Sequence, residues 1–201
     1  MRTKLRWQVV IPVLGITMAL GVWQALSQNS AAQVEKTAGD RQSSIQAFAV
    51  VASVLMSPRC LNCHIPGESP LQGDAGTPHN MNVKRGSDGR GTPAMRCSNC
   101  HQEENSSQLH GPPGRTGWRL PPPSMPLAWQ GLTIGELCRS VRDSATNGNK
   151  NPTQLIEHVS EDPFVNWGWN PGPGRSIPPV SHEEFVSAVT AWLDAGAYCP
   201  Q

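Results

Sequence analysis

The sequence is poor in the residues that usually build a large hydrophobic core. Its 201 residues include only three Phe and one Tyr, against 19 Gly and 19 Pro. A chain of this composition buries little apolar surface by itself. No segment shows the sustained alternation of apolar and polar residues that is typical of β-strands. The 16 basic and 15 acidic residues nearly balance, so nothing in the charge indicates nucleic acid binding.

What is present is a pattern of six cysteines, four of which stand in two copies of C-x-x-C-H, at residues 60–64 and 97–101. This is the attachment pattern of c-type haem: two thiols reach the two vinyl groups of the porphyrin, and the His binds the iron. A four-cysteine zinc site is the alternative, but it leaves the His after each pair unexplained. We therefore predict two covalently attached haem c groups, held by Cys60, Cys63, Cys97 and Cys100, with His64 and His101 as proximal ligands.

The N-terminus is typical of an exported protein. Arg2, Lys4 and Arg6 precede an apolar run from residue 9 to residue 23, and small residues follow where a signal peptidase would cut. We expect a signal peptide over residues 1–32, or an uncleaved membrane anchor, and a linker over residues 33–42. Either way the rest of the chain faces the periplasm. Without its three leading basic residues the chain has 13 basic and 15 acidic residues, a net charge of about −2.

The remaining residues, 43–201, have the length of one domain, which we expect to be mainly α. Helices are predicted over residues 43–56, from Thr133 to a stop at residues 147–148, over residues 153–160, and from Ser181 to Ala195. Long Pro- and Gly-rich loops separate them. We expect a small cytochrome c-like helical domain whose loops wrap around two haems, because the haems would supply the missing apolar bulk. The motifs are 37 residues apart, so the haems are expected to share one fold.

Two cysteines, Cys138 and Cys199, are left over after the haem motifs. In an oxidising compartment an even remainder indicates a disulfide. The alternative is a pair of buried free thiols.

The sixth ligand of each iron decides whether the site is closed for electron transfer or open for chemistry. His79, in the loop P-H-N-M-N, and His158, beside apolar residues of the third predicted helix, are the first choices as distal ligands. Met125, in L-P-P-P-S-M-P, is the alternative. His110 and His182 are expected to be exposed. Three arginines of the Pro/Gly loops, beside Trp118, Trp167 and Trp169, are either partners of haem propionates or surface residues: Arg115, Arg119 and Arg175.

Several segments resemble one family. They are P-H-N-M-N-V-K-R-G from Pro78, M-R-C-S-N-C-H from Met95, W-R-L-P-P-P-S-M-P from Trp118, W-G-W-N-P-G-P-G-R from Trp167 and A-G-A-Y-C-P from Ala195. Together these are similar to periplasmic dihaem cytochromes labelled as subunits of isoquinoline 1-oxidoreductase-type molybdenum hydroxylases. The likeness covers about residues 45–200. It implies a cytochrome that takes electrons from a molybdopterin and iron–sulfur dehydrogenase and passes them to a downstream cytochrome or oxidase of the respiratory chain.

The leading hypothesis is therefore a non-catalytic electron carrier with two six-coordinate haems. The alternatives are a small dihaem peroxidase and a gas-binding haem protein, both of which need one open iron.

Overall fold

The computed structural model describes residues 14–201 and divides the chain after Asp40 into two compact units. The basic residues of the predicted signal peptide, Arg2, Lys4 and Arg6, lie outside the described residues. In the first unit the described residues belong to α1 (Leu14–Leu55), so residues 33–42, predicted as a linker, are helical and exposed. Among residues 14–201, no helix contains an apolar stretch long enough to cross a membrane.

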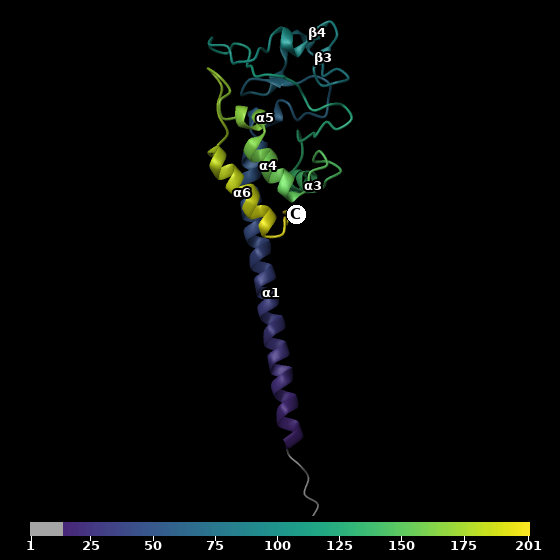
Figure 1. The fold of residues 1–201 in the computed structure, drawn as a ribbon, viewed down its shortest axis with the longest axis vertical. Coiled ribbons are helices and arrows are strands. Elements are labelled where there is room, and N and C mark those ends of the chain that lie inside the picture. The colour runs from purple at the N-terminus through teal and green to yellow at the C-terminus, as the bar shows by residue number, and fades with distance from the viewer. Residues whose placement is uncertain (1–13) are drawn as a thin grey trace, which may run out of the picture. The chain divides into compact units, whose positions relative to one another are not determined.

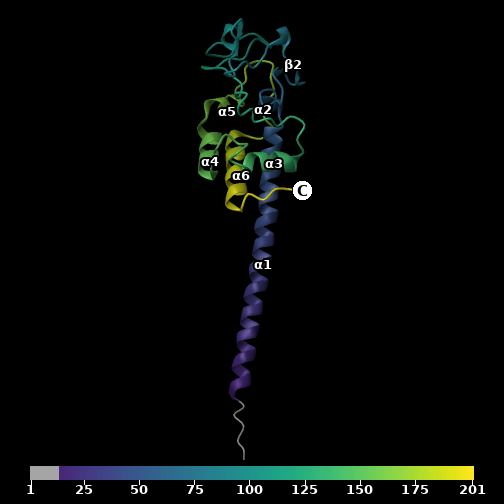
Figure 2. The same cartoon turned by 90° about the vertical axis from the view of Figure 1, so that its right-hand side faces the viewer.

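The second unit, Arg41–Gln201, begins two residues before the predicted domain start at residue 43. It is mainly helical, which confirms the predicted class, and its helices lie beside the last turns of α1 (Figures 1 and 2). After α1 these helices are α2 (Pro58–Leu61), α3 (Ile134–Arg142), α4 (Pro152–Glu161), α5 (Pro163–Trp167) and α6 (His182–Asp194).

Local capping sets the starts of the three longer helices. At α3 the Thr133 side chain accepts a hydrogen bond from Glu136 N, and the Glu136 carboxylate accepts one from Thr133 N. Asn151 and Gln154 form the same reciprocal pair at α4, and Ser181 caps α6. The predicted end of α3 at residues 147–148 is wrong. The helix stops at Arg142, because the Asp143 carboxylate accepts from Ala145 N and turns the chain away.

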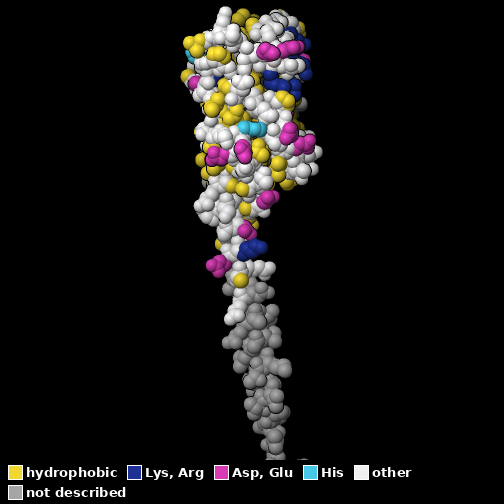
Figure 3. Space-filling view, turned by 60° about the vertical axis from the view of Figure 1, so that its left-hand side comes forward, with side chains coloured by type: hydrophobic (Ala, Val, Ile, Leu, Met, Phe, Trp, Pro, Cys, Tyr) yellow, Lys and Arg dark blue, Asp and Glu magenta, His cyan; other side chains and the backbone are white. Residues whose placement is uncertain are grey.

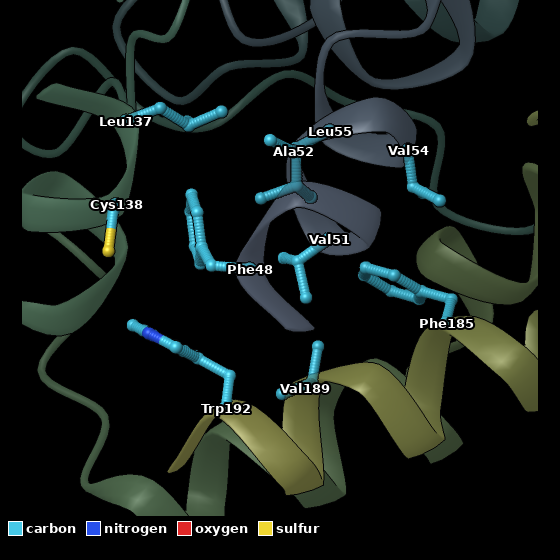
Figure 4. Close-up of a cluster of buried hydrophobic side chains, with 10 residues drawn as sticks. All are labelled: Phe48, Val51, Ala52, Val54, Leu55, Leu137, Cys138, Phe185, Val189 and Trp192. Atoms are coloured by element: carbon cyan, nitrogen blue, oxygen red, sulfur yellow. The ribbon is translucent and has the colours of Figure 1, made fainter. Parts of the chain in front are cut away.

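The core lies between α1, α3 and α6 (Figure 4). Phe48 of α1 packs on Trp192 of α6 with ring centroids 4.9 Å apart, and both side chains are fully buried. Ser44 links α1 to α6 and to the C-terminal tail by hydrogen bonds: its Oγ donates to Trp192 O and accepts from Tyr198 N. The other core side chains are Val51, Ala52, Val54, Leu55, Leu137, Cys138, Phe185 and Val189.

The C-terminal tail is fixed to this core by the predicted disulfide. Cys138 of α3 is bonded to Cys199 across 61 residues of chain. A link of this span stabilises the folded state by about 2–5 kcal/mol, chiefly by restricting the unfolded chain.

Residues between α2 and α3 are mostly loop and form one end of the unit, drawn in teal in Figures 1 and 2. Two short antiparallel hairpins shape them: β1 (Leu71–Gln72) with β2 (Thr77–Pro78), and β3 (Gly91–Thr92) with β4 (Met95–Arg96). On the face shown in Figure 3, side chains of both charges gather near this end, and hydrophobic side chains are scattered among polar ones.

Candidate haem-binding site

Both C-x-x-C-H motifs fold into the same single helical turn. In the first, the N–H groups of Cys63 and His64 donate to Cys60 O at 3.2 and 3.1 Å. In the second, the N–H groups of Cys100 and His101 donate to Cys97 O at 3.2 and 2.9 Å. Residues three and four apart share one face of a helical turn, so two sulfurs and one imidazole are presented together in each motif.

The two motif turns follow different secondary-structure elements. The first motif follows α1 closely: α1 ends at Leu55, and Ser57 is the N-cap residue of α2, which contains Cys60. The second follows the β3–β4 hairpin, and Cys97 begins a 3-10 turn, Cys97–Asn99. Cys60, Cys63, Cys97 and Cys100 are all free thiols. Burial raises the pKa of Cys60 to about 12 and that of Cys63 to about 11, so these thiols are neutral at pH 7.

The two motif histidines, His64 and His101, also have similar surroundings. His64 Nδ1 lies 2.9 Å from Leu127 O, and His101 Nδ1 lies 2.7 Å from Pro113 O. A carbonyl oxygen only accepts, so Nδ1 carries the proton in both rings and Nε2 keeps its lone pair. Burial lowers the pKa of both imidazoles, for His64 to about 4, which leaves them neutral at pH 7. A neutral imidazole oriented through its other nitrogen is the usual form of a metal-ligating histidine.

Each of these imidazoles is stacked on an indole. The His64 ring lies 3.6 Å from Trp129 at an interplanar angle of 6°, and the His101 ring lies 4.6 Å from Trp118 at 4°. Trp118 in turn meets Trp167 edge-on at 5.0 Å. The stacking fixes the plane of each imidazole. The hydrogen bond from Nδ1 fixes the direction in which Nε2 points.

His79 is brought to the second motif. The β1–β2 hairpin ends just before it, and its ring centroid lies 6.0 Å from that of His101. Imidazole nitrogens bind metal ions at about 2.0–2.1 Å, so two rings on opposite sides of one ion have centroids roughly 6 Å apart. His79 Nδ1 donates to Asn80 O, which again leaves the Nε2 lone pair free.

His158 is the candidate distal ligand for the first motif. It lies on α4, near enough to contribute to the lowered pKa of His64. Its Nδ1 is 3.3 Å from the Asp162 carboxylate, so its Nε2 is available. Burial lowers the pKa of His158, and Asp162 acts in the opposite direction.

The remaining candidate ligands are Met125, His110 and His182. Met125 stands in the segment that leads to Leu127, and its sulfur faces Gly148, 3.8 Å from the Cβ position there. His110 is exposed, as predicted. The prediction for His182 is wrong: this ring is half-buried, donates from Nε2 to Val159 O and packs against Trp169, because the first turn of α6 lies against α4.

The three loop arginines have defined partners. Arg115 and Arg119 place their guanidinium groups over the Phe164 ring, at 4.2 and 4.8 Å from its centroid. Arg175 donates to Gly111 O and Pro171 O. A cavity of about 420 Å³ beside His101 is lined by Arg90, Arg96 and Arg115 and also by Asp88 and Glu103. Arg96 is paired with Asp88, so side chains of both charges lie beside the second motif.

Sequence reasoning missed two residues of this region, Trp129 and Arg85. Trp129 follows His64 by 65 residues, whereas Trp118 follows His101 by 17, so no repeated spacing marks the stacked indoles. Arg85 is fully buried and donates to backbone carbonyls of two distant segments. In the sequence it stands in the segment P-H-N-M-N-V-K-R-G, where no local pattern predicts that its guanidinium is buried.

No group of three or more His, Cys, Asp or Glu side chains in the described part of the chain is placed to hold a metal ion. Comparison with models of protein families, with curated proteins and with solved structures finds no match of any of the three kinds.

Proposed function

We propose that this chain is a dihaem c-type cytochrome that relays single electrons and is not itself an enzyme. The observation that carries this proposal is the common state of His64 and His101: each donates from Nδ1 to a backbone carbonyl and keeps a free lone pair on Nε2. The same arrangement occurs next to two thiols in both motifs, which is the donor set that c-type haem requires.

The roles of the residues follow from this arrangement. Cys60 and Cys63 hold one haem and Cys97 and Cys100 the other, and the long loops of the second unit wrap around both. When bound, each haem supplies a one-electron iron couple. His79 is the proposed distal ligand opposite His101, supported by the 6.0 Å separation of their rings. His158 is the proposed distal ligand opposite His64, and Met125 is the alternative.

The proposed partners rest on the resemblance to dihaem cytochromes of molybdenum hydroxylases. The donor would be a molybdopterin and iron–sulfur dehydrogenase, and the acceptor a downstream cytochrome or oxidase. The proposed location is the periplasm, because c-type haem is attached outside the cytoplasm and the N-terminus has the pattern of an exported chain. A membrane association would require that the N-terminal segment is not cleaved.

Production of the full chain in a host with a c-type haem maturation system tests the attachment. We expect mass spectrometry under denaturing conditions to give the mass of the processed polypeptide plus two haems, because thioether bonds survive denaturation. A polypeptide mass without haem would contradict the proposal. So would zinc that the native chain binds and loses on unfolding.

A further inference from the structure

We propose that Arg85 raises the reduction potential of the haem held at His64, as a buried positive charge that no carboxylate pairs with. This inference rests on the proposed function, and it assigns a role in tuning that haem to a residue outside both motifs.

The Arg85 guanidinium binds the chain just after the first motif. The residue is 1% exposed, and its Nη2 donates to Ile65 O at 2.8 Å and to Gly67 O at 2.9 Å. Ile65 is the residue that follows His64. The Nη1 group donates to Pro121 O at 2.9 Å, which ties the same guanidinium to the loop that carries Trp118.

All three acceptors are neutral carbonyls. Within residues 14–201 no carboxylate forms an ion pair with Arg85, and its buried Nε has no hydrogen-bond partner. Arg59 is the contrasting case. It is also buried, at 7% exposed, but its Nη2 meets the Asp74 carboxylate at 2.6 Å. The charge of Arg59 is therefore compensated locally, and that of Arg85 is not.

The charge of Arg85 reaches the first motif. Its Nη2 donates to the carbonyl of Ile65, the residue that follows His64. Burial lowers the pKa of Arg85, and Glu68, an exposed carboxylate beyond ion-pair distance, acts in the opposite direction. A charge inside the protein is screened far less than one in water. Reduction adds one negative charge to the iron, so a fixed positive charge nearby favours the reduced state.

The test compares Arg85→Gln, which removes the charge, with Arg85→Lys, which keeps it. Spectroelectrochemical titration of the dihaem protein gives both potentials, and a variant with Cys97 and Cys100 replaced by Ala identifies the haem at His64. We expect Arg85→Gln to shift the reduction equilibrium of that haem by about tenfold towards the oxidised state, which corresponds to about 59 mV. We expect Arg85→Lys to retain most of the wild-type value.

The double variant Arg59→Gln with Asp74→Asn is the matched control. It removes a buried arginine near the same motif together with its partner, so the net charge does not change and the potential should stay close to that of the wild type. An unchanged potential in Arg85→Gln, or an equal loss in Arg85→Lys, would overturn the inference while leaving the dihaem proposal intact. A wild-type chain that carries no haem would overturn both.

A second pair of variants decides the question if Arg85→Gln does not mature. Nothing lies within 4 Å of the Cβ position at Gly67, whose carbonyl accepts from Arg85, so a short side chain fits there. Gly67→Asp adds a carboxylate to the residue whose carbonyl accepts from Arg85, and Gly67→Asn adds a neutral group of the same shape. We expect a lower potential for Gly67→Asp than for Gly67→Asn, and equal potentials would overturn the inference.

Discussion

Replacement of both Cys97 and Cys100 by alanine is expected to give a chain that carries one covalent haem instead of two. The two motif turns are built from separate elements, one after α1 and one after the β3–β4 hairpin, so loss of the second pair of thiols leaves the first pair in place. Without thiols the vinyl groups of the second haem have no bonding partner. Mass spectrometry under denaturing conditions reads the number of haems directly.

The matched control for this prediction replaces the other two cysteines. Cys138 and Cys199 form the disulfide that fixes the C-terminal tail. Their replacement by alanine lowers the stability by about 2–5 kcal/mol but leaves all four haem-binding thiols in place, so two haems should remain bound. Two haems on the variant without Cys97 and Cys100 would show that these thiols are not the attachment points.

Replacement of His79 by alanine is expected to open one of the two irons to carbon monoxide. The ring centroid of His79 lies 6.0 Å from that of His101, and alanine offers no ligand in place of the imidazole. The reduced variant should bind one carbon monoxide per chain, followed as a change in the visible spectrum, and the wild type none.

His110 provides the control for His79. It is also a loop histidine, but it is exposed, and its backbone N–H donates to Pro173 O. The variant His110→Ala keeps the backbone bond and should behave as the wild type does. If His79→Ala binds no carbon monoxide while both haems are attached, His79 is not the distal ligand of the haem at His101.

The helices of the second unit could be predicted because their signals are local. Thr133 with Glu136 and Ser181 with Glu184 mark the starts of α3 and α6, and both helices begin there. The end of α3 differs from the predicted stop at residues 147–148, because the carboxylate of Asp143 competes for backbone N–H groups five residues before Gly148.

Contacts between distant segments could not be predicted in the same way. The spacing of apolar residues does not predict that Trp129 stacks on His64, or that Arg85 binds the carbonyls of Ile65 and Pro121. Both contacts depend on how the loops close over the motifs. His79 was predicted as a distal ligand on a different ground, because a His among Pro and Asn has no core role. Its ring lies 6.0 Å from that of His101, and the ligand role stays a prediction.

The α1 helix shows a further limit of local patterns. A helix was predicted only from residue 43, because only there do apolar residues recur at helical spacing. In the structure α1 spans Leu14–Leu55, and its exposed residues 32–42 include Ala, Gln, Glu, Lys and Arg, which favour helix without needing a buried face. The amphipathic pattern thus marked the part that packs in the core, and not the full length of the helix.

Carbon monoxide binding to the reduced, fully matured wild-type protein tests the central claim most directly. An electron carrier with His79 and His158 as distal ligands has two six-coordinate irons, so its visible spectrum should not change when carbon monoxide is added. A spectral change that accounts for one of the two haems would reveal an open iron. That result would contradict the carrier and favour the peroxidase or gas-binding alternative.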